Sequence, residues 1–197
     1  MPAEQADVRQ HILDTAKPII LGKGFSAVGL NELLSAADVP KGSFYHYFKS
    51  KEAFGEALLD SYFCSYQERL SEILQHGGGC AGERLMRYWQ LWLDTQANDG
   101  PDGKCLAVKL GGEVSDLSEA MRSALERGTG RIVDAIAACI REAQADASLP
   151  ADIDAADCAL VLYNLWLGAT VLTKIRRNRS ALEAAMAATR QLLQAAP

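Results

Sequence analysis

Apolar residues recur at spacings of three and four along nearly all of the 197-residue chain, which is the period of an amphipathic α-helix. No run of strict alternation between apolar and polar residues lasts long enough to form a strand. We therefore expect an all-α fold of about nine helices. Breaks rich in glycine or proline separate them at residues 22–24, 77–79, 98–103, 111–112 and 148–150.

The first helix is expected over about residues 5–21, with Val8, Ile12 and Ala16 on one face and glycines ending it. Two short helices follow, over about residues 29–36 and from Pro40, a residue suited to the first helical position. Ser50 is a suitable N-cap for a long fourth helix. The later helices are expected at about 81–96, from 104, 118–145, 153–177 and 181–195.

The composition is that of an ordinary globular chain, with 49% hydrophobic and 23% charged residues. No uninterrupted apolar run reaches the roughly 20 residues that a membrane span needs, so we expect a cytoplasmic protein with no membrane partner. Five scattered cysteines without a CxxC pair indicate reduced thiols rather than a disulfide or zinc framework. With three histidines, no nucleotide loop and no nucleophile–base pair, we expect no metal, no cofactor and no enzyme activity.

The net charge of −5 is unevenly distributed along the chain. Residues 1–51 hold six Lys or Arg against five Asp or Glu, and residues 39–51 hold three lysines and no acid. A small basic module is thus joined to an acidic body. We expect two domains, over residues 1–50 and residues 51–197.

The second and third helices match the helix-turn-helix pattern, with Leu30, Leu33 and Leu34 before a turn at residues 37–39. A recognition helix places small and polar groups at its N-terminal end, where they meet base edges in the major groove. Phe44 and Phe48 are four residues apart and share the buried face. The DNA-contact candidates are Lys41, Gly42, Ser43, Tyr45, His46, Tyr47 and, as a phosphate ligand at the start of the fourth helix, Lys51.

Residues 8–60 resemble the TetR family of transcriptional repressors, through Gly24-Phe25, the leucines of residues 30–34 and the run from Lys41 to Glu52. The resemblance implies an all-helical homodimer that binds palindromic double-stranded operator DNA and holds an effector in its C-terminal domain. It makes residues 1–50 the DNA-binding domain and residues 51–197 the regulatory and dimerisation domain. The same seven DNA-contact candidates fall on the family's motif. One departure is Asp38, where the family usually has the turn glycine. We expect modest strain there, because Asp tolerates a left-handed backbone moderately well.

The last two expected helices are rich in alanine and carry long apolar faces at the end of the chain. Such faces need a partner, and a self-complementary two-fold contact is the commonest solution. We therefore expect a homodimer formed through these two helices.

Cys105 lies at the start of a short helix, beside Lys104 and four residues before Lys109. A helix N-terminus and neighbouring cations favour the thiolate, which is the reactive form of cysteine. The glycines of residues 100–103 make access to it plausible. The other reading is a buried small hydrophobic residue, which is our expectation for Cys139 and Cys158.

The stretches 105–110, 113–122 and 165–169 resemble a group of TetR-family repressors that respond to reactive electrophiles through a cysteine and control detoxification genes. The resemblance implies that Cys105 is the sensor and that alkylation or oxidation of its sulfur, acting through the fourth helix, moves the DNA-reading helices out of register. It also matches Lys174 to a position that could face the thiol, either as a cation or as an amine that captures an oxidised sulfur. Equally, Lys174 is a lysine that extends from a dimer helix into solvent.

An alternative inducer is an aromatic or apolar small molecule bound without a covalent bond. Such a pocket would be lined by Tyr88, Trp89, Trp92, Tyr163 and Trp166, which are at least as well suited to the core.

Overall fold

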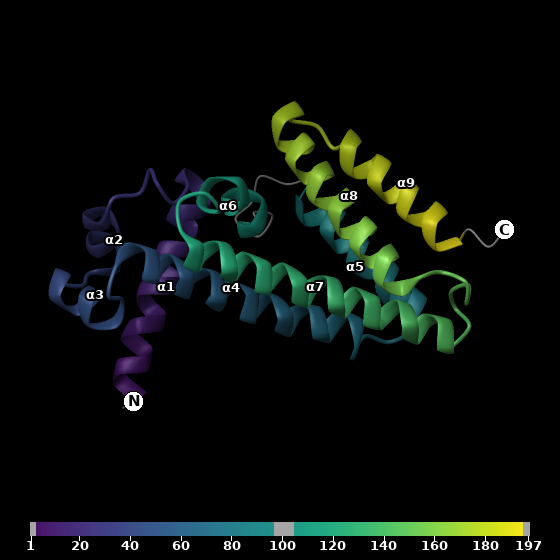
Figure 1. The fold of residues 1–197 in the computed structure, drawn as a ribbon, viewed down its shortest axis with the longest axis horizontal. Helices are drawn as coiled ribbons and strands as arrows, with labels where there is room; N and C mark the ends of the chain where they lie inside the picture. The colour runs from purple at the N-terminus through teal and green to yellow at the C-terminus, as the bar shows by residue number, and fades with distance from the viewer. Residues whose placement is uncertain (1–2, 97–104, 195–197) are drawn as a thin grey trace. The chain divides into compact units, whose positions relative to one another are not determined.

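The structure, a computed structural model of the full chain, describes residues 3–96 and 105–194. These residues are helical almost throughout and form no strand, which confirms the all-α expectation (Figure 1). The nine helices in the described part are α1 (Ala3–Lys23), α2 (Leu30–Ala37), α3 (Lys41–Tyr47), α4 (Lys51–Leu74), α5 (Ala81–Gln96), α6 (Leu106–Val114), α7 (Glu119–Ala145), α8 (Ala155–Arg176) and α9 (Ser180–Gln194).

The chain divides into two compact units that do not follow its linear order. Unit 1 consists of residues 1–64 and 104–128, and unit 2 of residues 65–103 and 129–197. Helix α6 and the start of α7 therefore pack with the N-terminal helices. The break expected at residues 111–112 is wrong, because α6 continues through both glycines to Val114. The expected boundary after residue 50 is a division by function, and it stays a prediction.

In unit 1, α1 buries Ile12, Ala16 and Ile20 along one face, as its periodicity predicts. The helix ends at Gly24, which has a φ of +94° and donates its backbone N–H to the Ile20 carbonyl oxygen at 2.8 Å. A glycine is required there, because a side chain in this conformation would be strained. The expected C-terminal glycine signal of α1 is thus confirmed.

The turn between α2 and α3 depends on Asp38, which adopts the left-handed conformation (φ 51°, ψ 46°). The next residue, Val39, donates its N–H to the Leu34 carbonyl oxygen at 3.1 Å and so closes the end of α2. The expectation for Asp38 is confirmed, since the aspartate takes the geometry that usually calls for glycine.

Helix α4 starts with the predicted cap, because Ser50 Oγ accepts the Ala53 N–H at 3.1 Å. One turn inside the helix, the Phe54 ring lies 5.4 Å from the ring of Phe44 and 5.2 Å from that of Phe48. All three rings are buried, so this aromatic cluster fixes α3 on the start of α4.

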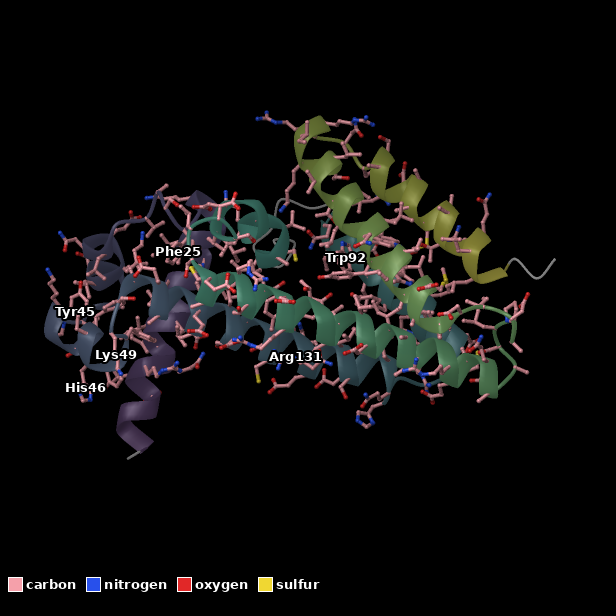
Figure 2. All side chains as sticks on the ribbon, viewed as in Figure 1. Phe25, Tyr45, His46, Lys49, Trp92 and Arg131 are labelled. Atoms are coloured by element: carbon pink, nitrogen blue, oxygen red, sulfur yellow. The ribbon has the colours of Figure 1, made fainter. Side chains whose placement is uncertain are left out.

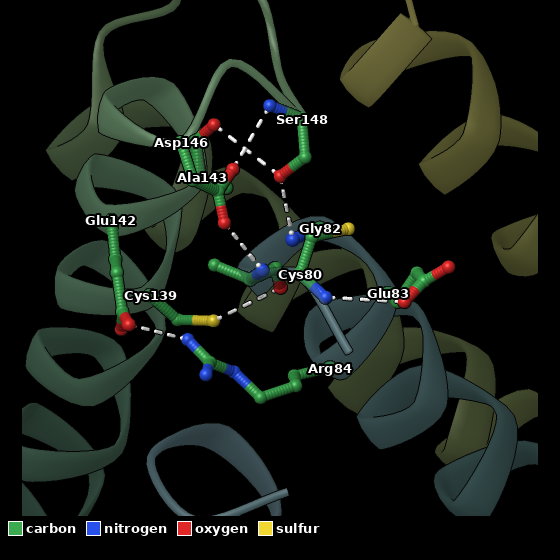
Figure 3. A network of polar contacts seen from close by, with 10 residues as sticks. Cys80, Gly82, Glu83, Arg84, Cys139, Glu142, Ala143, Asp146 and Ser148 are labelled. Carbon is green, nitrogen blue, oxygen red and sulfur yellow. Dashed lines mark hydrogen bonds and ion pairs between the residues drawn. The ribbon is translucent and has the colours of Figure 1, made fainter. Parts of the chain in front are cut away.

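In unit 2, the N-terminus of α5 is closed by the end of α7 (Figure 3). Asp146 accepts the Ala81 N–H at 2.8 Å, and Ser148 Oγ accepts the Gly82 N–H at 2.9 Å. These side chains satisfy amide donors that have no partner within their own helix. They therefore fix the first turn of α5 against α7.

Helices α8 and α9 pack side by side in unit 2 and with α5 form the rest of its core (Figure 1). Asp154 caps α8 by accepting the N–H groups of Ala156 and Asp157. By length and composition, α8 is the one helix of the described residues that could cross a membrane. Its largest side chain, Trp166, is fully buried in the core of unit 2 instead.

Candidate nucleic-acid interface and thiol site

Helix α3 presents the side chains that the sequence selects for DNA contact. Pro40 precedes its first turn with a φ of −68°, and the helix ends after only seven residues. Tyr45 is 45% exposed and His46 is also exposed, and Figure 2 shows both side chains extending from α3. The exposed candidates are Lys41, Gly42, Tyr45 and His46, and the half-buried ones are Ser43 and Tyr47.

The N-terminal end of α3 carries polar or small residues, Lys41, Gly42 and Ser43. A Cβ atom placed on Gly42 would have no neighbour within 4 Å, so the backbone there is open to an approaching surface. The Lys41 Nζ lies 5.9 Å from the centre of the Tyr45 ring, which brings a cation and a hydroxyl to one patch. This surface suits base-edge and phosphate contacts in a major groove.

Lys51 has protein partners in this structure. Its Nζ donates to the Phe25 carbonyl oxygen at 2.9 Å and lies 4.6 Å from the centre of the Phe25 ring. Lys51 is half-buried, so this side chain supports the residues between α1 and α2. Its role as a phosphate ligand stays a prediction.

Two further cations near α3 were not selected from the sequence. Lys49 is exposed directly after the helix (Figure 2). The guanidinium of Arg9, on α1, lies 5.2 Å from the centre of the Phe48 ring. Lys49 could have been chosen from the basic run, whereas the place of Arg9 depends on how α1 crosses α3.

Cys105 is the N-cap residue of α6 and belongs to unit 1, together with α1, α2 and α3. Its side chain is buried, with 8% of its surface exposed. The Tyr62 hydroxyl donates to its sulfur at 3.5 Å, and Lys17 Nζ lies 5.5 Å from the centre of the Tyr62 ring. Sequence reasoning missed Tyr62, because no pattern in the chain pairs it with a cysteine 43 residues away.

Of the three lysines expected near the thiol, the structure describes Lys109 and Lys174. Lys109 lies one turn into α6, and its Nζ is 3.5 Å from the Gly22 carbonyl oxygen. Lys104 and the glycines of residues 100–103, which were expected to give access to the thiol, lie outside the described residues. Lys174 is exposed in the last turn of α8 and belongs to unit 2, so its pairing with Cys105 stays a prediction.

Glu113, in the last turn of α6, is bound to the residues that follow α1. Its Oε1 accepts the Ser26 N–H at 2.6 Å, and its Oε2 accepts the Phe25 N–H at 3.2 Å. Burial raises the pKa of this carboxyl, but the hydrogen bonds from Ser26 and Phe25 and the nearby Lys109 outweigh burial and hold the pKa below its usual value. Glu113 is therefore an anion at neutral pH.

The other cysteines have different environments. Burial raises the pKa of the Cys139 thiol to about 11, although Arg84 lies beside it (Figure 3), and the sulfur donates to the Ala81 carbonyl oxygen at 3.5 Å. Burial also raises the pKa of Cys158. Cys64, on α4, is exposed.

The five residues expected to line a pocket are brought together in unit 2. The rings of Trp89 and Trp166 stack at 5.1 Å, and Trp92 lies 6.0 Å from Tyr163. Tyr88 lies 4.7 Å from Trp89, so α5 and α8 share one continuous aromatic cluster. All five side chains are buried, and the ligand pocket that they would line stays a prediction.

The polar atoms of this cluster are unequally satisfied. The indole N–H of Trp92 donates to Thr170 and that of Trp166 donates to Thr189, both at 2.9 Å. By contrast, the buried indole N–H of Trp89 has no hydrogen-bond partner within the described residues. An unsatisfied buried donor costs about 1–3 kcal/mol.

Comparison with known proteins identifies the family. Residues 12–58 match the family described as "Bacterial regulatory proteins, tetR family", and residues 81–189 match the "Tetracyclin repressor-like, C-terminal domain". The helix-turn-helix and the helical C-terminal part agree with both matches. The chain belongs to the TetR family of transcriptional regulators.

Similarity to individual proteins covers nearly the whole chain. It is 42% identical over 187 residues to the HTH-type transcriptional repressor NemR of Escherichia coli strain K12, covering 95% of this chain and 94% of NemR. It is 34% identical over 176 residues to the repressor DhaR of Mycobacterium sp. strain GP1, covering 89% and 87% of the two chains. The crystal structure of E. coli NemR in its reduced form matches with a TM-score of 0.90 and 43% identity, covering 97% of this chain and 98% of that one. The chain is a DNA-binding repressor of this family, similar to NemR.

Proposed function

We propose that this repressor releases its operator when the sulfur of Cys105 is modified by an electrophile or an oxidant, and that it thereby controls detoxification genes in the cytoplasm. The observation that carries the proposal is the place of Cys105. The thiol lies at the N-terminus of α6 within the compact unit that also contains the DNA-reading helix. A change in its size or charge therefore occurs inside the DNA-binding unit.

The environment of the sulfur supports this role. The Tyr62 hydroxyl donates to the sulfur, and the sulfur belongs to the N-cap residue of α6. A bond formed at this sulfur therefore changes the contacts of both Tyr62 and the start of α6. NemR, to which the chain is similar over nearly its full length, has a structure described as its reduced form, which agrees with a redox-active protein.

Two chemical routes lead from the thiolate to a changed α6. With a maleimide or quinone, the sulfur forms a bond to an alkene carbon, and the displaced electron pair takes a proton from water. With hypochlorous acid, the sulfur is oxidised to a sulfenic acid while the oxidant is reduced and leaves as chloride. Lys174 is a candidate amine to capture the sulfenic acid, because its nitrogen can form a bond to the sulfur while the sulfenic oxygen leaves as water.

The operator partner follows from the family, whose members bind operator DNA as dimers. We propose a palindromic site with half-sites about 34–36 Å apart, or a multiple of this spacing. Lys41, Gly42, Ser43, Tyr45, His46 and Tyr47 contact the groove and Lys51 a phosphate.

We propose that α8 and α9 form the dimer interface. Exposed apolar side chains follow one side of α8, at Leu160, Val161, Val171, Leu172 and Ile175. This helix starts beside acidic residues and ends beside basic ones, so two copies in antiparallel orientation place unlike charges opposite each other. The charged residues concerned are Asp154, Asp157, Lys174 and Arg176.

The test replaces Cys105 by serine and measures operator affinity by fluorescence anisotropy, on a duplex taken from upstream of the protein's own gene. Treatment with N-ethylmaleimide is expected to raise the Kd of the wild type at least about tenfold, within the usual range of allosteric coupling. Cys64→Ser, which removes an exposed thiol from the same unit, is expected to respond like the wild type. Cys105→Ser is expected to stay bound.

Release of the Cys105→Ser variant to the same extent as the wild type would show that another group senses the reagent. Equal affinity for operator and random DNA at moderate salt would instead count against the regulator itself.

A second candidate inducer, an aromatic molecule bound without a covalent bond, is favoured by the unpaired indole N–H of Trp89. An acceptor group on such a ligand would satisfy this donor, and the surrounding rings would stack on the ligand. This alternative predicts that an aromatic carboxylate quenches tryptophan fluorescence and releases the operator from Cys105→Ser. Trp89→Phe, which lacks the donor, is expected to bind that ligand more weakly.

A further inference from the structure

The residues between α1 and α2 form hydrogen bonds with side chains of two helices, α6 and α4, that are distant from them in the sequence. From one side, the Glu113 carboxylate of α6 accepts the N–H groups of Phe25 and Ser26. From the other side, Lys51, the first residue of α4, donates to the Phe25 carbonyl oxygen. Both peptide groups of Phe25 are thereby bound, one to α6 and one to α4.

Two further features fix the position of α6 against α1 and the residues that follow it. Lys109, one turn before Glu113 on the same face of α6, reaches the Gly22 carbonyl oxygen at the end of α1. A Cβ atom on Gly24 would lie 2.8 Å from Glu113 Oε2, so the absence of a side chain at Gly24 lets the carboxylate approach the backbone. Helix α6 is thus bound to α1 and to the α1–α2 connection through polar contacts.

The same short helix begins at Cys105. Helix α6 continues without a break from its first turn to Glu113 in its last turn, and a shift of a whole helix is one recognised form of allosteric change. From Glu113 a chain of contacts runs to Phe25, then to Lys51 and the start of α4, against which the rings of α3 pack.

We propose that Glu113 is the positioning residue that transmits modification of Cys105 to the DNA-reading helix, through its two hydrogen bonds to the backbone of residues 25 and 26. Glu113 touches neither DNA nor the reagent. This proposal rests on the thiol-based release proposed above and names the link within it.

The experiment measures a coupling ratio, defined as the operator Kd after treatment with N-ethylmaleimide divided by the Kd before it. For the wild type this ratio is expected to be about tenfold or more. Glu113→Ala is expected to bind the operator within about threefold of the wild type before treatment, and to keep a coupling ratio below about threefold. Glu113→Gln, which keeps one carbonyl acceptor and loses the charge, is expected to fall between the two.

Asp116→Ala is the matched control, because it removes an exposed carboxylate three residues further along the chain. It is expected to keep the full coupling ratio. Thermal unfolding checks that each variant is folded, and mass spectrometry checks that Cys105 is alkylated in each.

Three results would overturn the proposal. These are a full coupling ratio in Glu113→Ala, loss of operator affinity in folded Glu113→Ala before treatment, and failure of Cys105 to react in that variant. The second would make Glu113 part of the DNA-binding fold, and the third would make it a modifier of the thiol. A wild type that reacts at Cys105 yet keeps its operator would instead contradict the proposed function, so the two failures are distinguishable.

Discussion

Asp38 occupies a left-handed position that glycine adopts at lower cost, so the turn between α2 and α3 stores a small strain. We predict that Asp38→Gly raises the free energy of unfolding by about 0.5–1 kcal/mol, less than the full left-handed penalty because aspartate tolerates this region. Urea unfolding followed by circular dichroism measures the change. Ala36→Gly, in the regular helix just before the turn, is the control and is expected to lose about 1 kcal/mol. A loss of stability in Asp38→Gly would show that the aspartate side chain contributes more than its backbone costs.

Cys139 illustrates how burial decides the reactivity of a thiol. Because its pKa is raised to about 11 in the folded protein, above the ordinary value near 9, the folded state favours the neutral thiol. This contribution to the free energy of unfolding is fully present below pH 9. As the pH rises towards 11, the free energy of unfolding falls by up to about 2–3 kcal/mol.

We therefore predict that Cys139→Ala loses less stability than the wild type between pH 9 and 11, measured by urea unfolding across that range. In the native protein at pH 8, iodoacetamide is expected to label Cys64 readily and to leave Cys139 unlabelled until the chain unfolds. Equal labelling rates at the two positions would contradict the buried environment of Cys139.

At the scale of helices, α4 and α7 approach closely at Gly128. A Cβ atom there would clash with the ring of Phe63, whereas a Cβ atom on Gly130, two residues along the same helix, would meet nothing within 4 Å. We predict that Gly128→Ala destabilises the protein by about 1–3 kcal/mol through overpacking. Gly130→Ala is expected to stabilise it by up to about 1 kcal/mol, because alanine is the better helix former. Thermal melting of the pair measures both effects, and a stabilised Gly128→Ala would mean that the helices are further apart than described.

The helices themselves could be predicted closely from local signals. Ser50 marks the start of α4, Gly24 the end of α1, and the period of three to four selects the buried faces. The sequence could not predict that α6 belongs to the same unit as the N-terminal helices, because contacts such as that between Glu113 and Phe25 join residues 88 positions apart. Periodicity carries no information on such pairings.

The candidate site likewise has one part that the sequence predicts and one part that it does not. The exposed positions of α3 follow from its amphipathic pattern, since Phe44 and Phe48 share the buried face and Tyr45 and His46 lie away from it. By contrast, Lys51 donates to the backbone carbonyl oxygen of Phe25, and the sulfur of Cys105 accepts from the hydroxyl of Tyr62. Neither partner has a local sequence signal.

For the whole molecule, the proposed two-fold contact makes a prediction about assembly. Ile175 is 70% exposed near the end of α8, and Leu172 lies on the same side. We predict that Leu172→Asp combined with Ile175→Asp converts the dimer to a monomer, because burying two unpaired carboxylates costs several kcal/mol. Light scattering coupled to size exclusion measures the mass.

Leu91→Asp is the control, since Leu91 is similarly exposed on α5, outside the proposed interface. It is expected to remain a dimer. The double variant is also expected to lose most of its operator affinity, because a monomer engages one half-site. A double variant that stays dimeric would move the interface away from this part of α8.

The interleaved composition of unit 1 has a consequence for the order in which the chain folds during synthesis. Its N-terminal helices emerge from the ribosome first, but the segment that completes their packing ends only at residue 128. At a synthesis rate of about 5–20 residues per second, the interval between residues 64 and 128 lasts about 3–13 s. During that time the apolar surfaces of α1 and α4 that α6 and α7 will cover remain open to solvent and to chaperones. The DNA-binding unit of the newly made repressor therefore becomes complete only after α6 has been synthesised.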